Sequence, residues 1–564
     1  MVSNPESGIT SRQVNDIVNV ASHLTAMASC RPYQKAVINP VGRDDWGRVT
    51  YAHLTFRQLE KDTDCLAQGL ESIGISRGIR TILMVPPGPD FLTLIFALFK
   101  VGAVPVVVDP GMGIKRMIRC LRHTEPTAFI GVSKAYALRI FYLRHFRSVN
   151  TWVTVGPRKL FGANALARLF VQPWKPYQPV STGRDETAAI LFTTGSTGPA
   201  KGAVYTHGNF DAQVKLIRSQ FKVKPGEIDL PTFPLFALFD PALGMTAVIP
   251  DMDPTRPARV NPVKIIEAIL DHGVTNMFAS PALLDRVGEF GRSRGIRLPS
   301  LTRVVSAGAP VSPAIIETFS SMLTHRAQIH TPYGATEAMP VTSIASKEIL
   351  TKTQKMSQKG SGMCVGRPID QISVRIIQVS DMPINKWHDN LLVPSGHIGE
   401  IVVKGDLVTQ RYYDNPAADA LGKIRDKNGF WHRMGDLGWL DVQGRLWFCG
   451  RKSHRVVMHA KTLYTIPCEA IFNNHPDIFR SALVGVGAIP EQKPVICIEL
   501  KESANESEND RIREELITLS AANPHTKDIT TILFHSAFPV DIRHNAKIFR
   551  EELADWATEQ LEEE

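Results

Sequence analysis

The chain has 564 residues, of which 43% are hydrophobic and 21% are charged, and its formal net charge is +9 at pH 7. This length exceeds what one hydrophobic core usually serves, so we expect a soluble globular protein with two or more domains. The modest positive charge permits contact with anionic lipid or anionic substrates, but it does not indicate binding to nucleic acid.

The seven cysteines are scattered along the chain and form no C-x-x-C pair. This spacing argues against a disulfide framework or a structural zinc site, and it favours a reducing compartment. The first residues, "MVSNPESGITSRQVND", are polar and do not have the pattern of a signal peptide. We therefore expect a cytoplasmic protein.

Helical and strand patterns alternate in the first third of the chain. The stretch "TFRQLEKDTDCLAQGL" begins with Thr55 and has Gln58 three residues later, which is the pattern of a capping box. An apolar stripe follows at helical spacing, formed by Phe56, Leu59, Leu66 and Leu70. "TILMVPPG" and "TAFIGV" predict buried strands, and the alternation predicts an α/β architecture with largely parallel sheets.

One apolar stretch, "FLTLIFALFKVGAVPVVVDP", approaches the length of a membrane span. Lys100, Gly102 and Pro105 interrupt it. We predict instead the end of a helix, a turn at Gly102 and a buried strand over Val104–Val108.

A basic and apolar stretch follows, "KAYALRIFYLRHFRSVNTW", in which Arg139, Arg144 and Arg147 alternate with aromatic and aliphatic residues. "PRKLFGANALARLF" continues the pattern. Such a surface would bind anionic lipid at the membrane periphery or an acidic partner protein. The alternative is an ordinary solvated helix face.

The glycine-rich stretch "LFTTGSTGPAKGAVYTHGN" lies between two predicted strands, "AAILFTTG" and "GAVYTH". A helix is predicted after it, with Asn209 as its cap and with Phe210, Val214, Ile217 and Phe221 on one face. A P-loop would need G-x-x-x-x-G-K-[ST] leading directly into a helix, and this stretch leads into a strand. Its hydroxyl and backbone N–H groups still suit a polyphosphate, with Lys201 as a point charge, although a simple hairpin turn is the alternative.

Four further segments contain candidate site residues. "RVVSAGAPV" predicts a strand that ends in small residues, and "TPYGATEAMP" places Tyr333, Thr336 and Glu337 in a tight turn after an apolar strand. An aromatic ring there would stack on a base, and a carboxylate would hold Mg²⁺. "HRMGDLGWLDVQGRLWFCGRK" and "FPVDIRHNAKIFREEL" follow. Between these segments, the polar stretch "SKEILTKTQKMSQKGSG" predicts an exposed loop.

Together, in this order, these segments resemble the acyl-adenylate-forming superfamily, which includes acyl-CoA synthetases, luciferases and adenylation domains. The resemblance extends from about Thr50 to Arg550. It implies an α/β fold with a large N-terminal body of stacked α/β subdomains, residues 1–451, and a small mobile α+β C-terminal domain, residues 452–564. It also implies that a carboxylate attacks the α-phosphate of ATP, with Mg²⁺ present, to give an acyl-AMP and pyrophosphate.

The resemblance assigns the nucleotide contacts by position. The glycine-rich loop would hold the β- and γ-phosphates through Thr193, Thr194, Gly195, Ser196, Thr197, Gly198 and Lys201. Gly308, Ala309 and Pro310 would line the adenine, and Tyr333, followed by Gly334, would stack on it.

The remaining assignments concern the reacting groups. Thr336 would touch the α-phosphate, Glu337 would bind Mg²⁺, and Asp436 would take the ribose hydroxyls beside Arg451. Lys547 would be the catalytic lysine, because a positioned cation stabilises charge that develops on the phosphoryl oxygens. The alternatives are a turn carboxylate at Asp436 and a solvated surface lysine at Lys547.

Some positions depart from the family pattern. Pro199 lies one place early relative to Lys201, and Ser453 occupies the hinge position that is normally acidic or lysine. Beyond the hinge, where many CoA-using relatives have glycine, this chain has His459 and Ala460, whose side chains would obstruct a thiol arm.

Three stretches, "TTGSTGPAKGAVYTHGN", "GRKSHRV" and "VDIRHNAKIFR", resemble the motifs of a narrower branch of this superfamily, the β-lactone synthetases of bacterial long-chain olefin biosynthesis. That branch implies a long-chain 2-alkyl-3-hydroxy acid whose own hydroxyl expels AMP from the acyl-AMP and closes a β-lactone. It also implies assembly with other hydrocarbon-biosynthesis enzymes. The alternatives are a long-chain acyl-CoA synthetase and a nucleotide-binding protein without turnover.

The same resemblance places the acyl pocket at "FPLFALFDPALG". Phe233, Phe236 and Phe239 would form its apolar wall for a long-chain acid. An ordinary core segment is the alternative, because aromatic residues at this density are common in cores.

Overall fold

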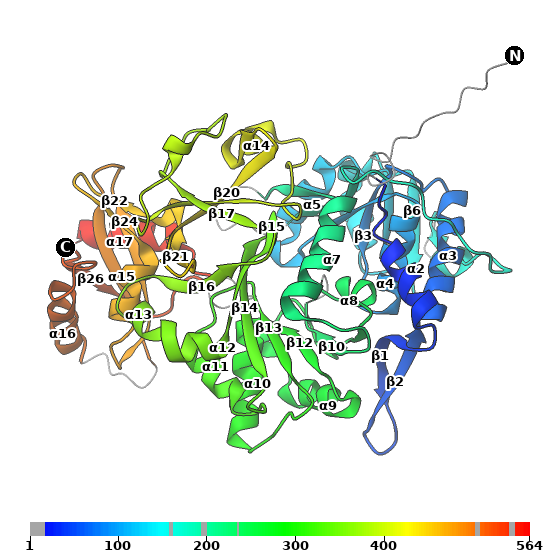
Figure 1. Ribbon diagram of the computed structural model, residues 1–564, viewed down its shortest axis with the longest axis horizontal. Helices are drawn as coiled ribbons and strands as arrows, with labels where there is room; N and C mark the ends of the chain where they lie inside the picture. Colours follow the sequence, from blue (N-terminus) through cyan, green and yellow to red (C-terminus); the bar gives the residue numbers. More distant parts are fainter. Residues whose placement is uncertain are drawn as a thin grey trace, which may run out of the picture.

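The structure, a computed structural model, describes residues 17–156, 162–192, 200–233, 236–501, 508–540 and 547–563. Two large sheets form most of the molecule, and a smaller body at the C-terminal end lies beside them (Figure 1).

The first sheet has seven strands in the described residues, and every neighbouring pair in it is parallel except β8 with β9. Their order in space is β7 (Asn164–Ala165), β6 (Thr151–Val155), β5 (Ala128–Val132), β3 (Arg80–Met84), β4 (Val104–Val108), β8 (Thr187–Phe192) and β9 (Gly202–Thr206). The strands predicted from "TILMVPPG", "TAFIGV" and Val104–Val108 are thereby confirmed.

The second sheet has fourteen described strands and joins a parallel half to an antiparallel half. The parallel half contains β1 (Lys35–Arg43), β11 (Thr246–Val248), β10 (Ile228–Pro231), β12 (Asn276–Ala279), β13 (Arg303–Ser306) and β14 (Gln328–Ala335), with β2 (Val49–Thr55) antiparallel at its edge. The antiparallel half contains β15 (Ala338–Ala345), β16 (Met363–Pro368), β21 (Leu446–Arg451), β20 (Gly429–Leu440), β18 (Gly399–Lys404), β17 (Ser373–Ile377) and β19 (Lys423–Asp426). The expectation of largely parallel sheets is therefore correct for the first sheet and for half of the second.

Helices cover these sheets. They are α2 (Ser22–Cys30), α3 (Phe56–Ser72), α4 (Pro89–Lys100), α5 (Ile114–His123), α6 (Ala137–Phe141), α7 (His207–Phe221), α8 (Phe239–Leu243), α9 (Pro262–His272), α10 (Pro281–Ser293), α11 (Pro313–Ser320) and α14 (Pro416–Gly422). Helices α7 and α8 lie between the seven-stranded sheet and strands β10 and β12 (Figure 1).

The predicted start of α3 is confirmed, because Thr55 and Gln58 form both hydrogen bonds of a capping box. The cap of α7 is one turn from the expected place. Thr206 is the N-cap, and Asn209 is the third helical residue that returns its side chain to the Thr206 backbone. The sequence TxxN therefore forms a capping box at this end of α7 as well.

Lys100, which interrupts the long apolar stretch, is fully buried at the end of α4. Its ammonium contacts Asp64 at 2.5 Å and Glu60 at 2.9 Å, both on α3. Loss of one partner from such a buried pair typically costs about 3–5 kcal/mol. The lysine therefore fixes α4 against α3. Among the described residues, no helix combines the length and the hydropathy that crossing a membrane requires.

The expected exposed loop at "SKEILTKTQKMSQKGSG" is wrong. The segment forms α12 (Ser346–Glu348), a π-helical turn (Ile349–Thr353) and α13 (Gln354–Gln358). Ile349 and Met356 pack against the core around Trp447, and Thr353 is buried. These three residues recur at helical spacing among lysines, which conceal the apolar face in the sequence.

The chain after β21 forms its own small sheets. A 3₁₀ turn (Lys452–His454) leads to the ribbon of β22 (Val456–Val457) and β23 (Thr462–Leu463), and then to β24 (Ile478–Val486), β25 (Lys493–Leu500) and β26 (Thr531–Phe534). Helices α15 (Thr465–Phe472), α16 (Asn509–Ala521) and α17 (Arg550–Glu563) accompany them. A domain boundary between residues 451 and 452 stays a prediction.

Candidate active site

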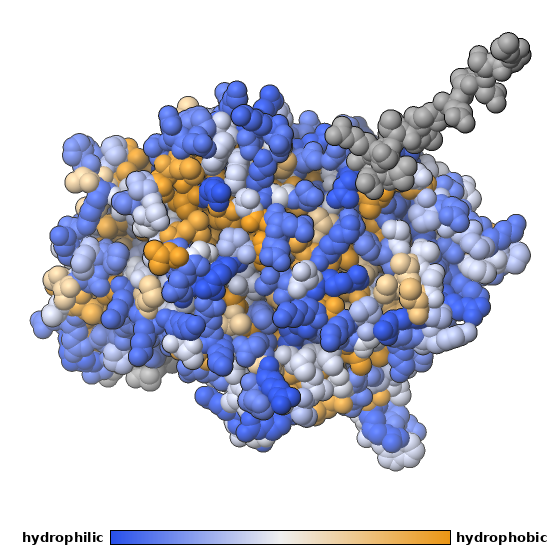
Figure 2. Space-filling model, viewed as in Figure 1, coloured by the Kyte–Doolittle hydropathy of each residue, from blue (hydrophilic) through white to orange (hydrophobic). Residues whose placement is uncertain are grey.

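One large cavity, of about 1400 Å³, joins the two sheets and the C-terminal body. It lies at the carboxyl ends of the parallel strands, where ligands of open α/β sheets bind. Its lining includes groups from β8, β13, β14, β20 and β21, and also Lys547 near α17. Figure 2 shows hydrophobic residues in the middle of a largely hydrophilic face, near β15 and β20.

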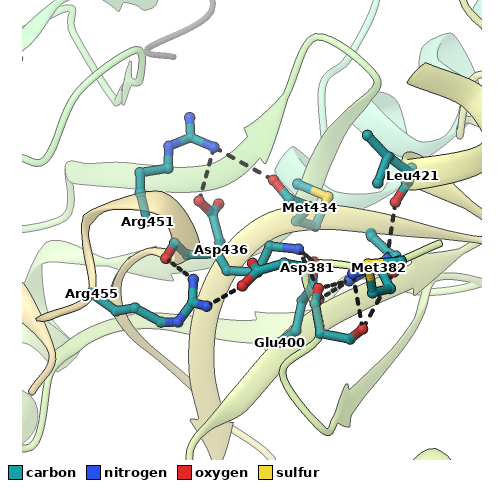
Figure 3. Close-up of polar contacts among 12 residues, drawn as sticks. Asp381, Met382, Glu400, Leu421, Met434, Asp436, Arg451 and Arg455 are labelled. Carbon is teal, nitrogen blue, oxygen red and sulfur yellow. Dashed lines mark hydrogen bonds and ion pairs between the residues drawn. The ribbon is translucent and has the colours of Figure 1, made fainter. Parts of the chain in front are cut away.

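A trio of side chains around the buried Asp436 occupies one wall of the cavity. The Tyr333 hydroxyl donates a hydrogen bond of 2.6 Å to one Asp436 oxygen, and the Arg451 guanidinium lies 2.9 Å from the other. Burial raises the pKa of Asp436, while Arg451 and the Tyr333 hydrogen bond favour its charged form. Figure 3 shows the Arg451 side chain, at the end of β21, directed at Asp436 on β20. All three residues of the trio were predicted to bind the nucleotide, and they contact one another here.

Glu337 lies in the turn between β14 and β15 and also lines the cavity. Its Oε1 atom accepts a hydrogen bond of 2.6 Å from Tyr412. Burial would raise the pKa of Glu337, but His432, the Tyr412 hydrogen bond and Lys423 outweigh it, and the pKa lies below its usual value. An ionised carboxylate at the cavity wall fits the oxygen ligands that Mg²⁺ prefers.

Lys201, the residue before β9, also lines the cavity and lies near Tyr412. Its ammonium lies 5.3 Å from the centre of the Tyr412 ring, in a cation–π arrangement. Lys201 and Glu337 thus approach Tyr412 from two separate segments. The predicted phosphate-loop residues Thr193, Thr194, Gly195, Ser196, Thr197 and Gly198 lie outside the described residues.

The small residues predicted at the adenine line the cavity between β13 and α11. Gly308 has φ +94°, a conformation that favours glycine, and Ala309 and Pro310 follow it in the wall. Gly334 approaches the β15 backbone so closely that a Cβ atom would lie 2.4 Å from the Ala338 carbonyl oxygen. Thr336 lines the cavity, and its carbonyl accepts a hydrogen bond from the Tyr205 hydroxyl.

Tyr333 was expected in a tight turn, but it lies within strand β14, and only Thr336 and Glu337 form the turn. The strand places its ring at 6.0 Å from Phe448 of β21, measured between ring centres. This packing fixes the ring that the resemblance assigns to base stacking.

The predicted aromatic wall is present. Phe233, Phe236 and Phe239 all line the cavity, and Phe236 stacks on Phe278 with 3.6 Å between ring centres. The ring centres of Phe236 and Phe239 are 6.5 Å apart. The segment therefore faces a space instead of filling a closed core.

The link to the C-terminal body is held by buried charges that the sequence did not reveal. Glu400, fully buried, contacts Arg433 at 2.6 Å and Lys452 at 3.0 Å. Arg455 pairs with Asp381 (Figure 3). Residues on both sides of Ser453 are thereby fixed to the antiparallel half of the second sheet, while Ser453 itself is exposed.

Lys547 lines the cavity together with Ile548 and Arg550. His454 lies between the two bodies, where burial and the nearby Arg550 lower its pKa to about 3.

His459 and Ala460 form an exposed turn between β22 and β23, and neither is among the described residues that line the cavity. In this arrangement these two residues do not obstruct the site.

Sequence reasoning missed Tyr412, Lys423 and His432 around Glu337. Lys423 is enclosed near the Tyr412 ring, and burial lowers its pKa to about 7. The stretch "QRYYDNPAADALGKIRDKNGFWH" carries no recognisable spacing of these three groups, because β-strand pairing and α14 bring them together.

Comparisons with known proteins agree with this geometry. A family model described as "AMP-binding enzyme" matches residues 26–413. The chain is 45% identical, over 97% of its length and 99% of the relative's, to an olefin beta-lactone synthetase of Xanthomonas campestris pv. campestris. It is 46% identical, over 97% of its length and 100% of the relative's, to an olefin beta-lactone synthetase of Stenotrophomonas maltophilia.

The fold is similar to that of o-succinylbenzoate coenzyme A synthetase from Bacillus subtilis in a structure with ATP and magnesium ion. The TM-score is 0.72 at 19% identity, and the match covers 94% of this chain and 98% of the other.

Proposed function

The chain belongs to the AMP-binding enzyme family, and from this premise we propose that it converts a long-chain 2-alkyl-3-hydroxy acid to a β-lactone. The observation that carries the proposal is the full-length similarity, at 45% and 46% identity, to two olefin beta-lactone synthetases. The apolar wall of the cavity supports a long-chain substrate.

The first step joins the acid to AMP. One carboxylate oxygen of the acid attacks the α-phosphorus of ATP, and pyrophosphate leaves with the electrons of the broken P–O bond. We assign the adenine to the wall of Gly308, Ala309 and Pro310, and the ribose hydroxyls to Asp436. Mg²⁺, held by Glu337, neutralises charge on the phosphates when it is bound.

The second step needs no other substrate. The 3-hydroxyl oxygen attacks the acyl carbon, the hydroxyl releases its proton, and AMP leaves with its bonding electrons. Closing a strained four-membered ring requires a good leaving group and a folded acyl chain, and an apolar enclosure holds the two reacting atoms together. The cavity walls therefore contribute to ring closure by limiting the conformations of the acid.

The product distinguishes lactone formation from thioester formation. With ATP, Mg²⁺ and a 2-alkyl-3-hydroxy fatty acid, we expect equimolar AMP, pyrophosphate and β-lactone, at a rate that added CoA does not change. Mass spectrometry of the lipid product, with and without CoA, makes the measurement. A thioester whose yield grows with CoA would instead identify an acyl-CoA synthetase.

Glu337→Gln should weaken the use of Mg²⁺. Because the pKa of Glu337 is lowered, the carboxylate is ionised at neutral pH, and the substitution removes a charge while keeping the shape. We expect half-maximal pyrophosphate release to require at least about tenfold more Mg²⁺, since loss of groups that merely support metal ligands already costs about 10–100-fold. Glu317→Gln, on the exposed face of α11, is the control. An unchanged Mg²⁺ requirement would remove Glu337 from the metal site.

Lys547→Ala should slow acyl-AMP formation much more than it weakens ATP binding. Lys547 lines the cavity, so we expect its ammonium to meet the phosphoryl oxygens whose charge changes in the reaction. Losing one such preorganised group typically costs about 10²–10³ in rate. Single-turnover acyl-AMP formation and ATP affinity are measured separately, with the exposed Lys493→Ala as control. A wild-type rate of acyl-AMP formation would remove Lys547 from the groups that act on the phosphates.

We also propose that the protein works in the cytoplasm, at the surface of an anionic membrane. Residues 110–184 contain 13 lysines and arginines and one acidic residue, whereas the remainder of the chain has a small excess of acids. Ile140 and Phe141 are each 78% exposed within this basic segment, and Leu143 is 62% exposed. Apolar residues among cations suit insertion between anionic headgroups.

Sedimentation with lipid vesicles tests this contact. We expect binding to anionic vesicles that falls with salt, weak binding to zwitterionic vesicles, and a loss of binding in Ile140→Ser/Phe141→Ser. Val442→Ser, at a residue that is 99% exposed elsewhere, should bind as wild type does. Equal sedimentation of all three proteins with anionic vesicles would contradict contact through Ile140 and Phe141. No sedimentation of the wild-type protein would contradict membrane contact and leave an acidic protein, such as another hydrocarbon-biosynthesis enzyme, as the partner.

A further inference from the structure

The acyl part of the cavity follows the length of helix α7. Phe210, Gln213, Ile217 and Phe221 all line it, and they lie on one face of the helix. From Phe210 to Phe221 this face is roughly 16 Å long, at about 1.5 Å per residue. The space is therefore extended parallel to α7.

The turn that carries Thr336 and Glu337 lies beside Gln213, near the middle of this face of α7. The Gln213 amide donates a hydrogen bond of 2.8 Å to the Met339 carbonyl, just after the turn that carries Thr336 and Glu337. Tyr205, which precedes α7, donates to the Thr336 carbonyl. An acyl group activated at Thr336 thus enters near Gln213, with cavity on both sides of it.

The limb at the amino end of α7, here the N-limb, lies against the seven-stranded sheet and α4. Its walls belong to the core cluster of that sheet and are apolar: Ile95, Phe99, Ala189, Phe210 and Leu238. The Phe99 and Phe210 ring centres are 5.7 Å apart.

The limb at the carboxyl end of α7, here the C-limb, lies against the other sheet. Its walls belong to a separate core cluster: Ile217, Phe221, Leu243, Met245 and Val305. Its end is polar, where Asn276 and Arg303 both bind the Glu227 carboxylate, at 2.6 and 2.7 Å. Phe239 packs against both clusters and lies between the limbs.

We propose that the two limbs bind the two alkyl chains of a 2-alkyl-3-hydroxy acid, one chain in each. This inference rests on the proposed function. The two chains of such an acid diverge from adjacent carbons, C2 and C3, next to the activated carbonyl. A space that opens at its middle and extends both ways matches that branching, whereas an unbranched acid fills only one limb. The paired charges at the end of the C-limb set a limit on the chain that it accepts.

Two substitutions that each fill one limb test the proposal. Ala189→Phe narrows the N-limb and Val305→Phe narrows the C-limb. The substrates are two isomeric acids, one with a long alkyl group at C2 and a short chain beyond C3, and the other with these lengths exchanged. We expect the ratio of kcat/KM for the two isomers to change by about tenfold or more, in opposite directions for the two variants, since even one methylene discriminates by about 10–200-fold.

Folding is checked by thermal melting and by ATP affinity, because neither residue belongs to the nucleotide wall. If a phenylalanine prevents folding, Ala189→Leu and Val305→Leu carry the same expectation. A shift in the same direction for both variants, or no shift, would overturn the two-limb assignment. If the wild-type protein forms no lactone from either acid, the proposed function fails instead, independently of the variants.

Discussion

The burial of Asp436 is the constraint on which the arrangement of the site depends. A carboxylate that is 3% exposed must be paired and hydrogen-bonded, or its charge is lost. Arg451 supplies the cation and Tyr333 the hydrogen bond, from the end of β21 and from β14. Three segments are thereby fixed around one point. Since Arg451 is also the last residue of β21, the same contact holds the start of the link to the C-terminal body.

A second buried carboxylate, Glu400, fixes the residue that follows Arg451. Glu400 binds both Arg433, on β20, and Lys452, the first residue of the 3₁₀ turn. Without Lys452, the buried Glu400 carboxylate would lose one of its two cationic partners, which is unfavourable. Lys452 is therefore held against the second sheet. Beyond Ser453, the Arg455–Asp381 pair and a hydrogen bond from the Asn474 amide to the Gln358 carbonyl connect the C-terminal body to the rest of the chain. Ser453 lies between the two restrained residues Lys452 and Arg455, and a hinge at Ser453 stays a prediction.

Sequence patterns among neighbouring residues predicted helices and strands correctly. They did not predict contacts between residues that are far apart in the sequence. The capping box at Thr55 and the strand Val104–Val108 follow from neighbouring residues, so the sequence predicted both. Lys100 was correctly interpreted as evidence against a membrane span, but Asp64 and Glu60 could not be identified because they lie on another helix. The lysine-rich surface of residues 346–358 concealed a helical apolar stripe. At the site, the motifs gave Tyr333, Asp436 and Arg451, whereas Tyr412, Lys423 and Glu400 have no local signal.

The shape of the acyl space follows from the same packing. Helix α7 begins directly after β9 of one sheet and ends against the cluster beside β13 of the other, so its apolar face bridges two separate cores. Phe239 touches both clusters without filling the space along the helix. A packed interior normally leaves few voids larger than a water molecule, so an apolar space of this extent is typical of a ligand-binding pocket. An acid with two chains fills both ends at once, and its reacting carbons are then held opposite the Thr336–Glu337 turn, where the carbonyl and the hydroxyl must meet.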